Sequence, residues 1–66
     1  MINEIQAVQS ALTYARQFDG IRNVRRFSAQ RLDNDDWGVY VEGINRKGEV
    51  ASVKIRIDPD GGLTRV

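Results

Sequence analysis

The apolar residues between positions 3 and 18 recur at spacings of three and four, which is the period of one helix face. Polar residues such as Gln9 and Thr13 gather on the opposite arc, so we expect a surface helix with one buried side. The predicted buried side consists of Ile5, Val8, Ala11, Leu12, Ala15 and Phe18. Asn3 is a suitable N-cap, with Gln6 completing a capping box, and Gly20 suits the left-handed position after the helix ends.

After Gly20 the apolar spacing changes to two, which indicates that the chain passes from helix to sheet. We expect strands over residues 23–31, 37–44 and 50–57, followed by a short edge strand over residues 63–66. In the first strand Val24 is out of phase with Phe27 and Ala29, and a bulge near Arg25 and Arg26 would reconcile them. The second and third strands alternate cleanly.

Directly opposed residues in an antiparallel sheet share a face, and this rule fixes the turns. If Val41 opposes Val53, a three-residue loop of Arg46, Lys47 and Gly48 joins the strands, with Gly48 in a left-handed conformation. Phe27 then opposes Val41 in the first hairpin. We therefore predict an α+β fold in which one N-terminal helix packs on a three- to four-stranded antiparallel meander, as a single domain over residues 1–66. The residues expected to be most buried are Leu12, Phe27, Trp37, Val41, Val53 and Ile55.

The composition of this 66-residue chain limits the classes of function that it can have, because the chain contains neither Cys nor His. It therefore lacks a cysteine nucleophile, a serine triad and the commonest metal ligands, which argues against an enzyme. The net charge of +1 is too balanced to imply nucleic acid by itself. No apolar run approaches the roughly 18 residues of a membrane span, and the first ten residues lack the pattern of a signal peptide. We expect a cytoplasmic protein without a cofactor.

Two acidic segments have the composition of turns rather than of metal sites. Residues 33–36 are rich in oxygen ligands, but the glycine of a calcium-binding loop is missing and Trp37 follows. Residues 58–62 contain two glycines, but no helix or Lys-Ser pair follows to bind phosphate. We predict no metal site.

One helix covers one side of a sheet, so the other side remains for a partner. The candidate partner-binding residues on that side are Arg26, Tyr40, Ile44, Val50, Lys54 and Arg56. They predict a small non-catalytic protein-binding module, inhibitory or regulatory, whose partner is another protein or a second copy. The alternative is a nucleic-acid-binding protein that uses Arg25 together with the basic members of this set. Against it, Tyr40 is the one stacking aromatic expected there, and Glu42 interrupts the cations.

The strand Trp37-Gly-Val-Tyr-Val-Glu42, the turn with Gly48 and the strand Val53-Lys-Ile-Arg-Ile-Asp58 resemble the PepSY-like domains. That resemblance implies a helix-plus-meander fold and an inhibitory or sensory role. Residues 37–66 are also similar to the end of gas vesicle protein O, although that family has more residues between the strands and a basic tail.

Overall fold

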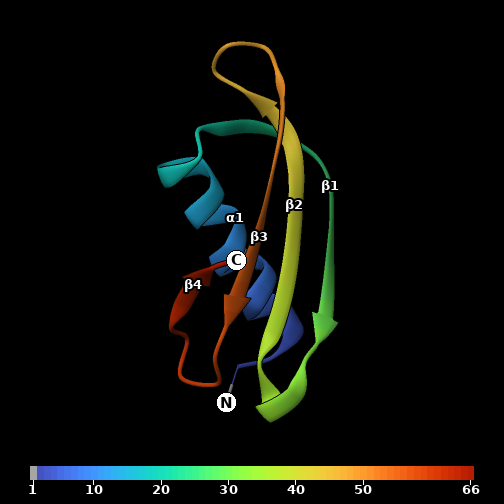
Figure 1. The fold of residues 1–66 in the computed structure, drawn as a ribbon, viewed down its shortest axis with the longest axis vertical. Coiled ribbons are helices and arrows are strands. Elements are labelled where there is room, and N and C mark those ends of the chain that lie inside the picture. The colour runs from blue at the N-terminus through green and yellow to red at the C-terminus, as the bar shows by residue number, and fades with distance from the viewer. Residues whose placement is uncertain (1) are drawn as a thin grey trace.

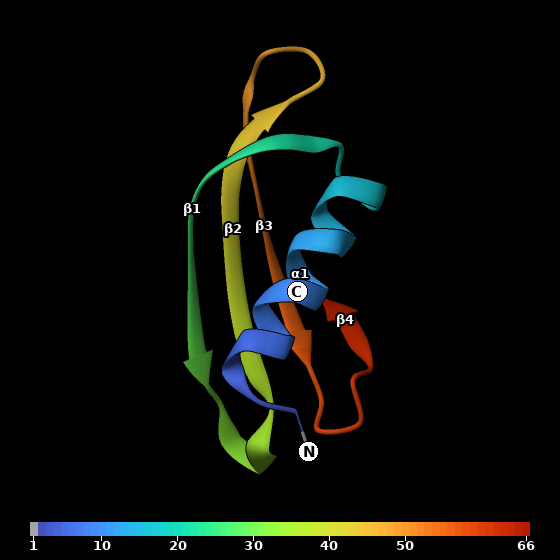
Figure 2. The ribbon, with the colours of Figure 1, turned by 180° about the vertical axis from the view of Figure 1, so that it is seen from behind.

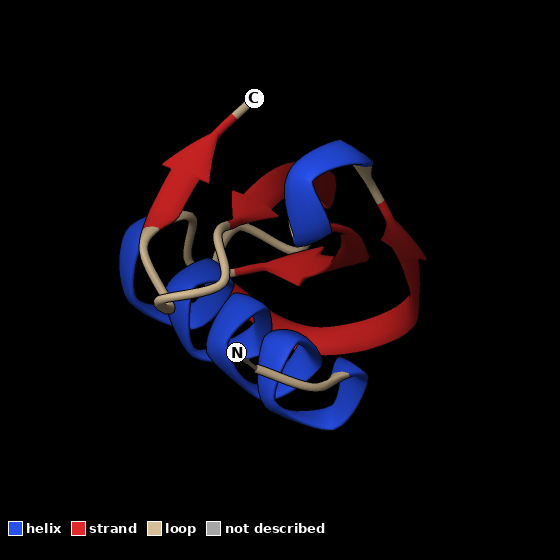
Figure 3. Cartoon of the chain, turned by 90° about the horizontal axis from the view of Figure 1, so that it is seen from below, coloured by secondary structure: helices blue, strands red, loops and turns tan. Residues whose placement is uncertain are grey.

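The computed structural model describes residues 2–66 as one helix packed on a four-stranded antiparallel sheet (Figure 1). The elements are α1 (Glu4–Phe18), β1 (Ile21–Arg31), the short 3-10 turn η1 (Asp33–Asp35), β2 (Trp37–Asn45), β3 (Val50–Ile57) and β4 (Leu63–Arg65). The strand order is β1-β2-β3-β4, so the predicted α+β meander is confirmed. Figures 2 and 3 show α1 on one side of the sheet. We call the side of the sheet that faces α1 the inner face and the opposite side the outer face.

Both ends of α1 follow from local chemistry. The Asn3 side chain accepts a hydrogen bond from the Gln6 amide (2.8 Å), and the Gln6 side chain accepts one from the Asn3 amide (3.0 Å). This is the predicted capping box, which satisfies two amides that the helix leaves unpaired. At the other end Asp19 is the C-cap and Gly20 has a φ of 66°. Ile21 then turns back into the core, where it is 1% exposed.

The strand register agrees with the predicted pairs. Val41 opposes Val53, Phe27 opposes Val41, and Gly48 has a φ of 80°. The first hairpin has a register shift at Arg25, as expected, and an additional one at Arg22. Next to the shift at Arg22, β1 passes so close to β2 that a Cβ on Gly43 would collide with the backbone oxygen of Asn23.

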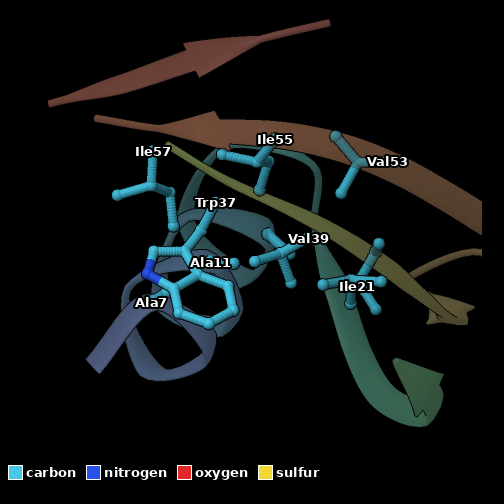
Figure 4. Packing of buried hydrophobic residues seen from close by; sticks show 10 residues of the cluster. Ala7, Ala11, Ile21, Trp37, Val39, Val53, Ile55 and Ile57 are labelled. Atoms are coloured by element: carbon cyan, nitrogen blue, oxygen red, sulfur yellow. The ribbon is translucent and has the colours of Figure 1, made fainter. Parts of the chain in front are cut away.

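The core lies between the inner face and α1, and Figure 4 shows most of its side chains. Its buried members are Ala7, Ala11, Ala15, Ile21, Trp37, Val39, Val41, Val53, Ile55 and Ile57. Four of the six residues predicted to be most buried are therefore in the core: Trp37, Val41, Val53 and Ile55.

The predicted buried face of α1 is right at Ala11 and Ala15, which are fully buried, but wrong at Ile5 and Phe18, and it omitted the buried Ala7. The fully buried positions of α1 are all alanines, whereas Ile5 is 68% exposed and Phe18 is 67% exposed. Leu12 packs against the core but is only half-buried. Three alanines at spacings of four form a flat strip, which lets the helix backbone approach the sheet closely. The larger apolar side chains then lie along the flanks of α1.

Phe27 is also wrongly assigned to the core. Its register places it on the inner face, but its side chain is 53% exposed. Phe27 lies beside the N-terminal half of α1, next to Ile5 and Val8, rather than beneath it. The prediction that Phe27 points to the inner face is therefore correct. The error is the assumption that one narrow helix covers the whole inner face, including Phe27.

The short strand β4 is attached to both layers. It pairs with β3 through Ile55 opposite Arg65 and Ile57 opposite Leu63. The Arg65 guanidinium also forms an ion pair with Asp19 at the end of α1 (2.5 Å). These contacts bring the C-terminal residues alongside the sheet, where they border the site described next.

Candidate binding face

The outer face carries all six residues predicted to bind a partner. The buried residues of β2 are odd-numbered, so its even-numbered side chains point to the outer face. The register places Tyr40 opposite Lys54, Ile44 opposite Val50, and Arg26 opposite Glu42. Arg56 alternates with the buried Ile55 and Ile57 and shares the same side. The predicted sharing of one face is therefore confirmed, while its use in binding stays a prediction.

The outer face is hollowed near its centre. A surface hollow of about 210 Å³ lies over the middle of β2 and β3. Its lining residues are Ser28, Gln30, Leu32, Gly38, Tyr40, Lys54, Ile55, Arg56 and Val66. Glycine at position 38 contributes to the depth, because a Cβ there would lie 3.1 Å from the Leu32 side chain. The hollow thus combines one aromatic ring, two cationic side chains and apolar walls.

Tyr40 is held in place by a chain of polar contacts. Its hydroxyl donates a hydrogen bond to Glu42 Oε1 (2.6 Å), and the same oxygen lies 3.3 Å from Arg26 Nη2. The Tyr40 hydrogen bond lowers the pKa of Glu42, with a further contribution from the charge of Arg26. The Glu42 carboxylate in turn raises the pKa of Arg26. The hydrogen bond to Glu42 therefore orients the Tyr40 ring and favours the ionised form of that carboxyl.

The two cationic side chains of the hollow, Arg56 and Lys54, differ in their ion pairing. Arg56 Nε donates to Asp36 Oδ2 (2.6 Å), and the Asp36 side chain is only 13% exposed. In the part of the chain that the structure describes, Lys54 forms no ion pair. Arg56 is thus oriented and partly neutralised, whereas Lys54 keeps a free charge for an external carboxylate.

Ile44 and Val50 lie apart from the hollow, at the end of the sheet near the β2–β3 turn. They oppose each other as predicted; Ile44 is half-buried and Val50 is 67% exposed. The predicted binding residues therefore form two patches. Tyr40, Lys54 and Arg56 line the hollow, with Arg26 beside it through its contact with Glu42, and the apolar pair forms the other patch.

Several residues that line the hollow were not predicted from the sequence. Val66 lines it because its amide donates to the Lys54 carbonyl (3.0 Å), which extends the pairing of β4 along β3. Leu32 lines it because the turn after β1 folds back, with the Leu32 amide donating to Asp36 (2.7 Å). Continuing the β3–β4 register by one residue would have found Val66. No spacing rule indicates the fold of the turn around Leu32.

The acidic segments behave as turns. Residues 33–36 reverse the chain between β1 and β2, and the Asp58 side chain accepts hydrogen bonds from the amides of Asp60 and Gly62. Across residues 2–66, no three acidic side chains lie close enough together to hold a metal ion. The chemistry that the outer face offers is charge pairing and apolar contact.

Among the described residues, no helix is long and apolar enough to cross a membrane. The resemblances to PepSY-like domains and to gas vesicle protein O remain predictions from the residue pattern. Comparison with protein-family models, with curated proteins and with solved structures finds no match to this chain.

Proposed function

We propose that this domain is a non-catalytic protein-binding module that acts through its outer face. The observation that carries the proposal is the hollow around Tyr40, in which a fixed aromatic ring lies beside Lys54, a cation that forms no ion pair with the described residues. Tyrosine and arginine are enriched where proteins bind each other tightly, and apolar walls provide the contact area. The module would act by occupying a surface of its partner, in an inhibitory or regulatory role.

The size of the hollow favours a side chain of another protein over a small molecule. Pockets for small molecules typically enclose about 300–1,000 Å³. The hollow of about 210 Å³ is smaller than that range and accommodates one or two side chains. An acidic residue next to an apolar one fits best, because Lys54 offers a charge while Leu32 and Val66 offer apolar surface.

Nucleic acid is the weaker candidate. A single-strand binder needs several stacking aromatics among its cations. Tyr40 points to the outer face, but Phe27 and Trp37 belong to the inner face. The Glu42 carboxylate beside Tyr40 would also repel phosphate.

The test is a binding titration of the isotopically labelled domain, followed by nuclear magnetic resonance. The probes are short peptides with Asp or Glu beside Leu or Phe, the same peptides with Lys in place of the acid, and a single-stranded oligonucleotide. We expect the acidic peptides to shift the resonances of Tyr40, Lys54 and Arg56. Lys54→Glu should abolish these shifts, while Lys47→Glu, the same charge change on the distant turn, should not.

Two results would contradict the proposal. The first is binding of the oligonucleotide with a steep loss of affinity as salt rises, which would assign the face to nucleic acid. The second is a set of peptide-induced shifts that excludes the hollow altogether.

A further inference from the structure

The strand β1 forms a long free edge of the sheet. It spans 11 residues, pairs with β2 on one side, and has no strand on the other side among the described residues (Figure 1). The register shifts at Arg22 and Arg25 disrupt its first half, and such bulges protect an edge from pairing. From Arg26 to Arg31 the register runs without a shift. This second half therefore remains a regular, unprotected edge.

The backbone of this regular segment offers hydrogen bonds outward. In an antiparallel pair, residues bonded to the partner strand alternate with residues whose amide and carbonyl point the other way. The Leu32 amide bonds to Asp36 across the hairpin (2.7 Å), so Ser28 opposite Tyr40 is also a bonded position. The amides and carbonyls of Phe27 and Ala29 therefore point to the free edge.

An exposed apolar surface lies directly beside this edge. Phe27 is 53% exposed and Ile5 is 68% exposed, although both are large apolar side chains. Together with Val8 they line a hollow of about 270 Å³ between α1 and β1. A strand added to β1 would place every second side chain over this hollow, because side chains alternate across a strand.

Charges along β1 and its turn are complementary to those of a second copy in antiparallel orientation. Arg22 and Arg25 lie in the first half of β1, and Asp33 lies just after its end. Within residues 2–66 none of these three forms an ion pair. Antiparallel pairing of two β1 strands around Ala29 brings Asp33 of each copy toward Arg25 of the other. A parallel arrangement would instead place arginine beside arginine.

We propose that two copies of this chain associate through β1, in antiparallel register centred on Ala29, to form one continuous eight-stranded sheet. The interface would combine main-chain hydrogen bonds at Phe27 and Ala29, burial of the Phe27 and Ile5 side chains, and two symmetric contacts between Arg25 and Asp33. A closed two-fold contact of this kind uses the same residues on both copies. It leaves the outer face free, so it is independent of the function proposed above.

The first test is sedimentation velocity over a range of protein concentrations, with Ala29→Pro as the disrupting variant. Proline lacks the amide that faces the edge, and it is tolerated on edge strands where that amide bonds to nothing inside the sheet. We expect the wild-type chain to form a concentration-dependent dimer, and Ala29→Pro to raise the dimer Kd by at least about tenfold. Ala29→Ser, which keeps the amide, should sediment like the wild type.

The second test is a charge reversal, which remains decisive if Ala29→Pro fails to fold. Arg25→Asp should weaken the dimer by a factor of about three to ten, and adding Asp33→Arg should restore it. Lys47→Glu changes the net charge by the same amount at a distant turn and should have no effect.

Three results would overturn the proposal. One is a wild-type chain that stays monomeric up to its highest soluble concentration. Another is a dimer that a folded Ala29→Pro variant leaves intact but that Ile44→Glu combined with Val50→Lys dissociates, which would move the interface to the outer face. The third is a failure of Asp33→Arg to restore the dimer lost in Arg25→Asp.

Discussion

Gly48 carries the backbone conformation on which the β2–β3 turn depends. Its φ is 80°, its amide donates to the Asn45 carbonyl (3.0 Å), and a Cβ at this position would have no atom within 4 Å. The cost of a side chain here is therefore backbone strain alone. Gly48→Val should lower the free energy of unfolding by about 1 kcal/mol or more, measured by urea denaturation. Gly48→Asn should recover much of this loss, because Asn tolerates positive φ; equal losses for Val and Asn would contradict this account.

The Tyr40 hydroxyl lowers the pKa of Glu42 through a hydrogen bond. Its hydrogen bond is the largest cause that lowers the pKa of that carboxyl, ahead of the Arg26 charge. A carboxyl with a lowered pKa in the folded state adds stability above its unfolded pKa, and this contribution is lost as pH falls through the folded value. Tyr40→Phe should therefore raise the pKa of Glu42, measured by following its side-chain resonance against pH. Tyr14→Phe is the control because Tyr14 lies on α1 against Phe18. If the pKa of Glu42 is the same in Tyr40→Phe and in the wild type, the Tyr40 hydrogen bond does not lower it.

At the level of elements, the strands could be predicted well and the orientation of the helix could not. Alternation over residues 37–57, combined with the turn at Gly48, leaves one register that places Val41 opposite Val53. A helix with apolar residues over a wide arc has several possible buried faces. The chain buries the alanine strip because this flat face lets the helix approach the sheet closely. A prediction that expects the largest apolar side chains to be the most buried would choose a different face.

The centre of β3 should be the most sensitive part of the core. Ile55 is fully buried, so Ile55→Ala should cost about 2–5 kcal/mol and leave the domain largely unfolded. Leu12→Ala should cost less, because Leu12 is only half-buried. Phe27→Ala, at a side chain 53% exposed, should cost the least in a monomer. Thermal melts by circular dichroism, at concentrations where the chain is monomeric, check this order. If Phe27→Ala unfolds the monomer, the flanking position of Phe27 is wrong.

For the whole molecule, the sequence predicts which residues share the outer face but not the shape of that face. Alternation places Tyr40, Lys54 and Arg56 on one side, as the register confirms. The hollow among them depends on the turn that folds Leu32 back and on the pairing that carries Val66 alongside β3. Those contacts join distant parts of the chain, and no local spacing encodes them.

The distance between the two layers of the molecule should depend on the small size of the alanine strip. Ala11 is fully buried at the centre of α1, between Ala7 and Ala15, and it packs in the same cluster as Val39 and Trp37. Ala11→Leu would add three carbon atoms where the core has little space, so the helix would have to move away from the sheet. We expect a loss of about 1–3 kcal/mol in urea denaturation, although leucine forms helices nearly as well as alanine. Thr13→Leu, on the exposed arc of the same helix, is the matched control and should change stability by less than about 0.5 kcal/mol. Equal stability for Ala11→Leu and the wild type would mean that α1 does not rest on its alanines.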